Sequence, residues 1–205
     1  MALRRVRAVI AAMVLLGHGG CGGSSDDSSP APPPPPMAVK DVQFGAGMVT
    51  VRNRIGELKE ILREGPLSIY RFEPAEADNR TRQRTPVQFY DFHFHREELA
   101  EVQVLYDLDE LQAEIGRDTF FRTIEERYQT KEDFNAPDGR RWINMDKGVE
   151  VRWREDFEHD SGRLTITWIE RKDAIEAARK SLRGRLKDEQ DSGDGDDNGG
   201  VDIGI

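Results

Sequence analysis

The sequence predicts an α+β fold in which two modules, each a helix followed by an antiparallel β-hairpin, form one sheet with helices packed on one face. Two patterns in the central part of the chain support this fold class. Apolar residues recur at steps of three and four residues in three segments, which is the spacing of amphipathic helices. Between these segments, apolar and polar residues alternate with a period of two, which is typical of strands with one buried face.

The first module begins with a helix and continues into a hairpin. Apolar residues recur at helical spacing over 55–62, and a Gly-Pro pair at 65–66 ends the run. Residues 88–95 then alternate between aromatic side chains on one face and mostly polar side chains on the other. A short turn at 96–99 leads to a second strand over 102–106, which has apolar residues on one face. We therefore expect a hairpin with a buried aromatic face.

The second module repeats this order. An apolar stripe over 120–128 predicts a helix, and alternation over 149–154 predicts a strand. A turn at 160–162 connects it to another strand over 164–168, and Trp142 is expected to begin an extra strand before this pair. The strand tryptophans are expected in the core.

A closing helix is predicted over 172–187, and with it the folded domain spans 41–187. Four apolar residues of this helix recur at helical spacing and are expected to face inward: Ile175, Ala178, Leu182 and Leu186. The domain is large enough to bury about 68–70% of the surface that its extended chain exposes.

Composition and charge exclude several classes. The chain has 205 residues, a formal net charge of −9 and one cysteine. Residues 188–205 hold seven acidic and no basic residues, whereas 41–187 hold 26 basic and 30 acidic residues, so most of the acidity lies in the tail. This balance argues against a nucleic-acid binder, which needs a basic face. A single cysteine excludes an intrachain disulfide framework, and no apolar run reaches the roughly 18 residues of a membrane-spanning helix.

The first 20 residues have the pattern of a signal peptide. Three arginines precede an apolar run of ten residues over 8–17, which is too short to span a bilayer. Cys21 follows, and a Gly/Ser-rich and then Pro-rich segment extends to residue 40. This linker is predicted to act as a tether that holds the domain away from its attachment point.

The place of Cys21, between the apolar run and the tether, resembles the signal of bacterial lipoproteins. The resemblance implies that Cys21 is acylated and anchors the protein to a membrane. Gly22 in place of Asp at the next position implies sorting to the outer membrane or cell surface. His18 departs from the aliphatic residue of that class. Cleavage after Gly19 or Gly20 without lipidation is therefore the alternative, and it implies a periplasmic protein.

The repeated order of helix and hairpin resembles the SmpA/BamE-type outer-membrane-assembly lipoproteins and the tandem modules of beta-lactamase inhibitory proteins. Residues 47–50 (Gly-Met-Val-Thr) are similar to the opening of such modules, and 162–164 (Gly-Arg-Leu) to their hairpin turn. The resemblance implies a non-enzymatic domain. We expect a cell-envelope protein that binds another envelope protein through its exposed sheet face or loops, as a binding or assembly-support module.

A second hypothesis is a metal-dependent enzyme. Asp91, His93 and His95 occupy alternate positions of a predicted strand and share one face, as a row of metal ligands would. His159 or an acidic residue is the candidate for a further ligand. The alternative is that the three residues lie on a solvated strand face. No nucleophile elbow or glycine-rich phosphate loop supports other catalytic chemistry, so we expect no enzyme and no cofactor.

A third hypothesis is a calcium-responsive tail. Five residues match positions one, three, five, six and nine of an EF-hand loop: Asp194, Asp196, Asn198, Gly199 and Asp202. The twelfth position, normally a bidentate Glu, is Ile205, so the loop is incomplete. The alternative is that 188–205 is an acidic disordered tail that binds no ion.

Overall fold

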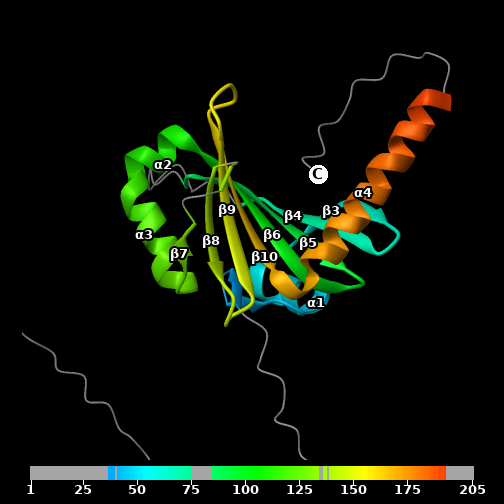
Figure 1. Cartoon of the computed structure of the whole chain (residues 1–205), viewed down its shortest axis with the longest axis horizontal. Helices are drawn as coiled ribbons and strands as arrows, with labels where there is room; N and C mark the ends of the chain where they lie inside the picture. The colour runs from blue at the N-terminus through cyan, green and yellow to red at the C-terminus, as the bar shows by residue number, and fades with distance from the viewer. Residues whose placement is uncertain (1–36, 40, 75–84, 134–135, 138, 193–205) are drawn as a thin grey trace, which may run out of the picture. The chain divides into compact units, whose positions relative to one another are not determined.

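A computed structural model describes residues 37–39, 41–74, 85–133, 136–137 and 139–192. These residues form four helices and ten strands (Figure 1). Eight strands make one antiparallel sheet, and β1 and β2 form a separate hairpin. The predicted α+β class is therefore confirmed. None of the described helices is both long enough and apolar enough to cross a membrane.

The sheet consists of two four-stranded meanders that meet at its centre. The first meander comprises β3 (Lys59–Glu64), β4 (Leu67–Phe72), β5 (Val87–His95) and β6 (Glu98–Asp107). The second comprises β7 (Lys131–Glu132), β8 (Arg140–Asn144), β9 (Val149–Asp156) and β10 (Ser161–Trp168). The strand order is β3-β4-β5-β6-β10-β9-β8-β7, so the last strand of each meander pairs with the other. A helix precedes each meander: α1 (Met48–Ile55) and α3 (Arg117–Tyr128). The sequence therefore predicted a repeat of a helix and antiparallel strands. Each meander has four strands, however, where two were predicted for the first module and a pair preceded by an extra strand at Trp142 for the second.

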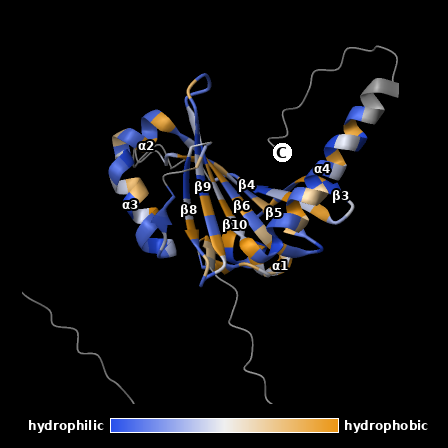
Figure 2. Ribbon diagram, viewed as in Figure 1, coloured by the Kyte–Doolittle hydropathy of each residue, from blue (hydrophilic) through white to orange (hydrophobic). Residues whose placement is uncertain are grey.

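One face of the sheet carries the main core. Hydrophobic and hydrophilic residues alternate along the strands (Figure 2), and the inward set packs against α1, α3 and the short helix α2 (Leu108–Glu114). Trp153 packs against Phe120 and Phe121, with ring centroids 4.9 Å and 5.9 Å away. Trp142 and Trp168 are also buried. The prediction that the tryptophans belong to the core is confirmed.

The folded part begins before residue 41. β1 (Met37–Val39) and β2 (Val42–Gln43) form a hairpin in which Ala38 and Val39 are buried. The hydroxyl of Tyr128 on α3 donates a 2.7 Å hydrogen bond to the carbonyl of Ala38. Residues 37–39 therefore belong to the domain and not to the predicted linker.

The helix predicted over 55–62 is wrong, because Ile55 is the only residue of that range that lies in a helix. Helix α1 ends at Ile55 because Gly56 adopts a φ of 120°, a conformation that L side chains rarely adopt. The chain then continues into β3, and the Gly-Pro pair at 65–66 connects β3 to β4 as a hairpin turn. Similarly, the turn predicted at 160–162 lies at 157–160, since Ser161 and Gly162 already belong to β10.

The closing helix α4 (Ile169–Ser192) lies on the opposite face of the sheet from the other three helices, so the prediction that the helices pack on one face is wrong for α4. It starts earlier and ends later than predicted, so residues 188–192 continue the helix. Leu182 packs against Leu67 and Ile69 in a second, smaller core. Ile175 is buried as predicted, but Leu186 is 37% exposed. Helix α4 covers the polar face only in part, and this incomplete cover creates the candidate site.

Candidate binding groove on the polar face of the sheet

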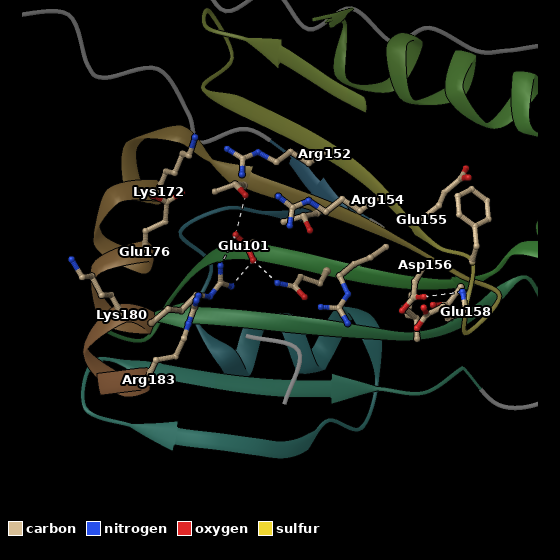
Figure 3. A pocket seen from close by; sticks show the side chains of 18 residues that line it. Glu101, Arg152, Arg154, Glu155, Asp156, Glu158, Lys172, Glu176, Lys180 and Arg183 are labelled. Carbon is tan, nitrogen blue, oxygen red and sulfur yellow. Dashed lines mark hydrogen bonds and ion pairs between the residues drawn. The ribbon is translucent and has the colours of Figure 1, made fainter. Parts of the chain in front are cut away.

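A groove of about 1110 Å³ lies on the polar face between α4 and the turn that follows β9 (Figure 3). Its floor is formed by β6, β10 and β9, and the side chains of α4 form one wall. The alternation of side chains between the two faces of each strand explains why polar residues line the groove. Positions such as 102, 164 and 151 point into the main core, so the residues between them face the groove.

The register arranges the floor in rows that cross three strands. The row next to α4 is Glu101–Thr167–Glu150, followed by Gln103–Thr165–Arg152 and then Leu105–Arg163–Arg154. The last row, at the far end, is Asp107–Ser161–Asp156. The floor therefore changes from acidic residues beneath α4 to basic residues in the open part, and back to acidic residues at the turn.

Glu101 attaches the middle of α4 to the sheet. Its carboxylate is 3% exposed and accepts hydrogen bonds from Arg179 (2.5 Å), Gln103 (2.9 Å) and Thr167 (3.0 Å). Burial acts to raise the pKa of Glu101, but the charge and hydrogen bonds of Arg179 outweigh it and lower the pKa to about 2. Glu101 is therefore ionised at neutral pH and holds the guanidinium of α4 in place.

His93 completes this buried network from β5. The Arg179 guanidinium donates to His93 Nδ1 across 2.9 Å, so that nitrogen is the unprotonated acceptor of a neutral imidazole. Burial lowers the pKa of His93 to about 4; Arg179 acts in the same direction and Glu101 opposes it. His93 Nε2 is buried and lacks a hydrogen-bond partner among the residues that the structure describes.

Glu150 attaches the start of α4 in the same way. It is 3% exposed and contacts Lys172 of α4 (3.0 Å), Arg141 of β8 (3.2 Å) and Arg152 of its own strand. Burial acts to raise the pKa of Glu150, but the bond from Lys172 and the charges of the arginines outweigh it, so the pKa is lowered. Two buried carboxylates therefore set the position of the helix that forms the wall.

The open part of the floor is basic. Arg163 and Arg154 are direct partners on β10 and β9, which places two like charges opposite each other. Lys180 and Arg183 project from exposed positions of α4 (Figure 3). Glu176 of α4 lines the same groove, so its surface carries charges of both signs.

The far end of the groove is acidic. Asp156 and Glu158 lie at the turn after β9 (Figure 3), where Asp156 accepts a 2.8 Å bond from His159. Phe157 between them is 75% exposed. Both carboxylate oxygens of Asp156 accept hydrogen bonds within this turn, so the groups that this end exposes are the side chain of Glu158 and the ring of Phe157.

In the structure, the side chains predicted as metal ligands form hydrogen bonds and ion pairs with other residues. Asp91 forms a two-point ion pair with Arg71 at 2.8 Å, and His93 accepts from Arg179. Both residues are buried, as is His95, so the strand face is covered rather than solvated. Among the described residues, no three His, Cys, Asp or Glu side chains are placed to hold a metal ion. The candidate further ligand, His159, instead pairs with Asp156.

Other predicted features lie outside the described residues. These are the signal peptide, Cys21 and most of the linker, together with the tail residues proposed for calcium. The lipid anchor and the calcium hypothesis stay predictions.

Comparison of the sequence and structure with known proteins did not identify a family for this chain. No family model matches the chain, and neither a curated protein nor a solved structure does. The resemblance to the SmpA/BamE-type lipoproteins and to beta-lactamase inhibitory proteins stays a prediction.

Sequence reasoning missed the groove itself. The sequence showed Arg154 as an alternating polar residue of a predicted strand, and it placed Arg163 in the turn motif at 162–164. Their direct pairing depends on the register of β9 with β10. The one available signal was the alternation of Arg152 and Arg154 with Val151 and Trp153, which indicates a basic strand face.

Proposed function

We propose that this protein is an exported lipoprotein of the cell envelope, anchored through Cys21, and that its domain binds another protein in the groove without catalysing a reaction. The observation that supports binding is the open groove with Arg154 and Arg163 side by side on its floor. The leader, Cys21 and the tether support export and anchoring.

The size and composition of the groove favour a macromolecular partner. Its volume of about 1110 Å³ exceeds the roughly 300–1,000 Å³ of most small-molecule pockets. It is lined mainly by charged and hydroxyl side chains rather than by the apolar surface that encloses small ligands. The two buried carboxylates, Glu101 and Glu150, are held by cations of α4, which fits a structural role rather than a catalytic one.

Site-specific photo-crosslinking in intact cells tests binding in the groove. A photoreactive amino acid replaces Thr165 on the floor or Lys180 on the wall, and Met145 serves as the control because it is 72% exposed and lies outside the groove. We expect the same discrete adduct from both groove positions and none from Met145. Equal labelling from all three positions, or none from the groove, would contradict the proposal.

Metabolic labelling tests the anchor. Growth with a labelled fatty acid should mark the protein and should fail to mark the Cys21→Ala variant. If the wild-type protein stays unlabelled while its leader is removed, the protein is secreted without a lipid.

A further inference from the structure

We propose that two copies of this protein associate through β3, so that their sheets join edge to edge as antiparallel strands. In this pairing, Lys59 of each copy lies opposite Glu64 of the other. The proposal concerns a surface other than the groove, and it does not depend on the proposed function.

Strand β3 is an open edge of the sheet. Among the described residues it pairs only with β4, and it lies beside α4 at one end of the strand order (Figure 1). An edge strand leaves a row of backbone N–H and C=O groups with which another strand can pair. The strand at the opposite edge, β7, has only two residues, whereas β3 has six. Of the two edges, β3 is therefore the one long enough to hold a second strand.

The sequence of β3 is complementary to itself when it is read in the opposite direction. Its residues over 59–64 are Lys-Glu-Ile-Leu-Arg-Glu. Antiparallel pairing about the midpoint places each charged side chain opposite one of the other sign, and the two central apolar residues opposite each other. A shift by one residue places Lys59 opposite Arg63. The reverse shift places Glu60 opposite Glu64, and like charges in such positions destabilise a sheet. The charges therefore specify one register between two copies.

A β-bulge at Ile61 allows this register. Two residues of β3 there occupy the space of one residue of β4, so Ile61 is the extra residue. Residues that oppose each other in an antiparallel pair point to the same face, and in a regular strand positions 59 and 64 would point to opposite faces. The residues of β4 that pair with these two positions are Arg71 and Leu67. They lie four positions apart and share a face, so the bulge brings Lys59 and Glu64 to one face.

The charges on the other face of β3 form a pair that the second copy extends. Glu60 and Arg63 contact each other at 3.3 Å, and both contact the hydroxyl of Tyr70. Their side chains are nonetheless 49% and 66% exposed. Two-fold pairing adds the same two charges of the second copy, so that four charges alternate in sign. Association therefore keeps the contacts within each chain and adds two ion pairs between the chains.

Lys59 gains an anion on association. It lies opposite Arg71 of β4, which has the same charge, and it forms no ion pair within the part of the chain that the structure describes. Glu64 contacts Arg185 of α4 at 2.6 Å, but its side chain is 40% exposed and can also accept from Lys59 of the second copy. The pairing therefore relieves the repulsion between Lys59 and Arg71.

The centre of the paired strands is apolar, and α4 leaves it accessible. Ile61 and Leu62 are partly buried and pack against the small core around Leu182. Pairing places Ile61 of one copy opposite Leu62 of the other and removes more of their surface from water. Helix α4 crosses the edge at Glu64, where Arg185 contacts it. The two crossings lie roughly 15 Å apart along the paired strands. This exceeds the spacing of about 8–10 Å between packed helices, so the two helices do not collide.

Sedimentation equilibrium of the full chain tests the association. Every sample carries Cys21→Ala, so that no lipid contributes. We expect a monomer–dimer equilibrium with a micromolar Kd, because two short strands bury less area than a standard interface. A protein that stays monomeric up to about 1 mM would overturn the proposal.

A charge exchange between two variants locates the contact. Lys59→Glu and Glu64→Lys each place like charges opposite each other at both ends of the paired strands. Either variant alone should raise the Kd of the dimer at least about tenfold, because two attractions are replaced by two repulsions. In an equimolar mixture, every opposed pair again carries opposite charges, and mixed dimers should form with a Kd within about threefold of wild type. Loss of folding in a variant would not be reversed by mixing.

The matched control makes the same changes of charge on α3. Arg122→Glu and Glu126→Lys alter exposed positions, and each variant, as well as their mixture, should keep the Kd within about twofold of wild type. Equal effects of the two sets of variants would overturn the proposal, as would a mixture of the β3 variants that stays monomeric. A photoreactive amino acid at position 59 should give an adduct between two copies in cells. An adduct with a different protein alone would assign the edge to that partner and overturn the proposal.

Discussion

Replacing Gly162 with alanine should destabilise the domain by about 3 kcal/mol. A Cβ atom added at Gly162 would lie 2.2 Å from the Trp153 ring and 2.9 Å from the side chain of Leu108. Carbon atoms pack at about 3.5–4.0 Å, so the indole would have to move by more than an ångström. Phe120 and Tyr106 prevent this movement, because their ring centroids lie only 4.9 Å and 5.7 Å from that of Trp153.

The magnitude follows from overpacking, which usually costs about 1–3 kcal/mol in a close-packed core. We expect the upper end of that range, because an aromatic cluster surrounds the indole. For a domain of this size, about 3 kcal/mol corresponds to a fall in Tm of roughly 10 °C. Urea denaturation followed by tryptophan fluorescence and circular dichroism measures the free energy of unfolding.

Gly184→Ala is the matched control, because Gly184 lies in exposed helix α4 with nothing within 4 Å of an added Cβ. The same chemical change should there raise the free energy of unfolding by about 0.5–1 kcal/mol, through helix propensity. If Gly162→Ala left the free energy of unfolding within about 0.5 kcal/mol of wild type, the argument about close packing would be refuted.

Three predictions concern the polar face. His93 has a folded pKa of about 4 against 6.5 when unfolded, so the unfolded chain binds a proton more readily and stability should fall by about 3 kcal/mol as the pH drops from 6.5 to 4. His93→Asn keeps an acceptor for Arg179 but does not titrate, and urea denaturation at several pH values should show a flatter profile over that window; an unchanged slope would contradict the assignment. Glu101 has a folded pKa of about 2, below its unfolded value of 4.5, so its stabilisation is present above pH 4.5 and is lost as the pH falls toward 2. Glu101→Gln leaves the guanidinium of Arg179 buried without its anion and should cost about 3–5 kcal/mol at pH 7 by the same assay, whereas a loss below about 1 kcal/mol would show that the pair is dispensable. Leu182→Ala removes the contact of α4 with Leu67 and should cost about 2–4 kcal/mol. In that variant, hydrogen exchange should speed up in α4 before the central strands; uniform acceleration would argue against a separate small core.

The strands were the most predictable elements, because period-two alternation reports directly which side chains are buried. The faces predicted for 88–95 and 149–154 agree with the structure: Phe92 and Val151 lie in the main core and His93 and Arg152 on the other face. The stripe over 120–128 likewise identified α3. These signals depend on neighbouring residues alone, so a single sequence suffices to read them.

The segment 55–62 was misread because the spacing of its apolar residues fits a continuous helix as well as it fits a chain that leaves α1 at Ile55 and enters β3 at Lys59. Gly56 marks the change, but its φ of 120° is visible only in the structure. Strand β3 is stabilised by pairing with β4. That pairing is a tertiary fact that local propensity does not determine.

The order of residues along this chain determined most of the stretches that are helical or extended, which side of each strand is apolar, and where the single cysteine and the acidic C-terminal residues lie. The tertiary structure decided that β6 pairs with β10, that α4 covers only part of the polar face, and that Arg163 stands opposite Arg154. The physical reason is that these features depend on contacts between residues that lie far apart in the sequence. Alternation reflects burial at each position, whereas the groove depends on the register between distant segments and on the buried carboxylates Glu101 and Glu150 that fix α4.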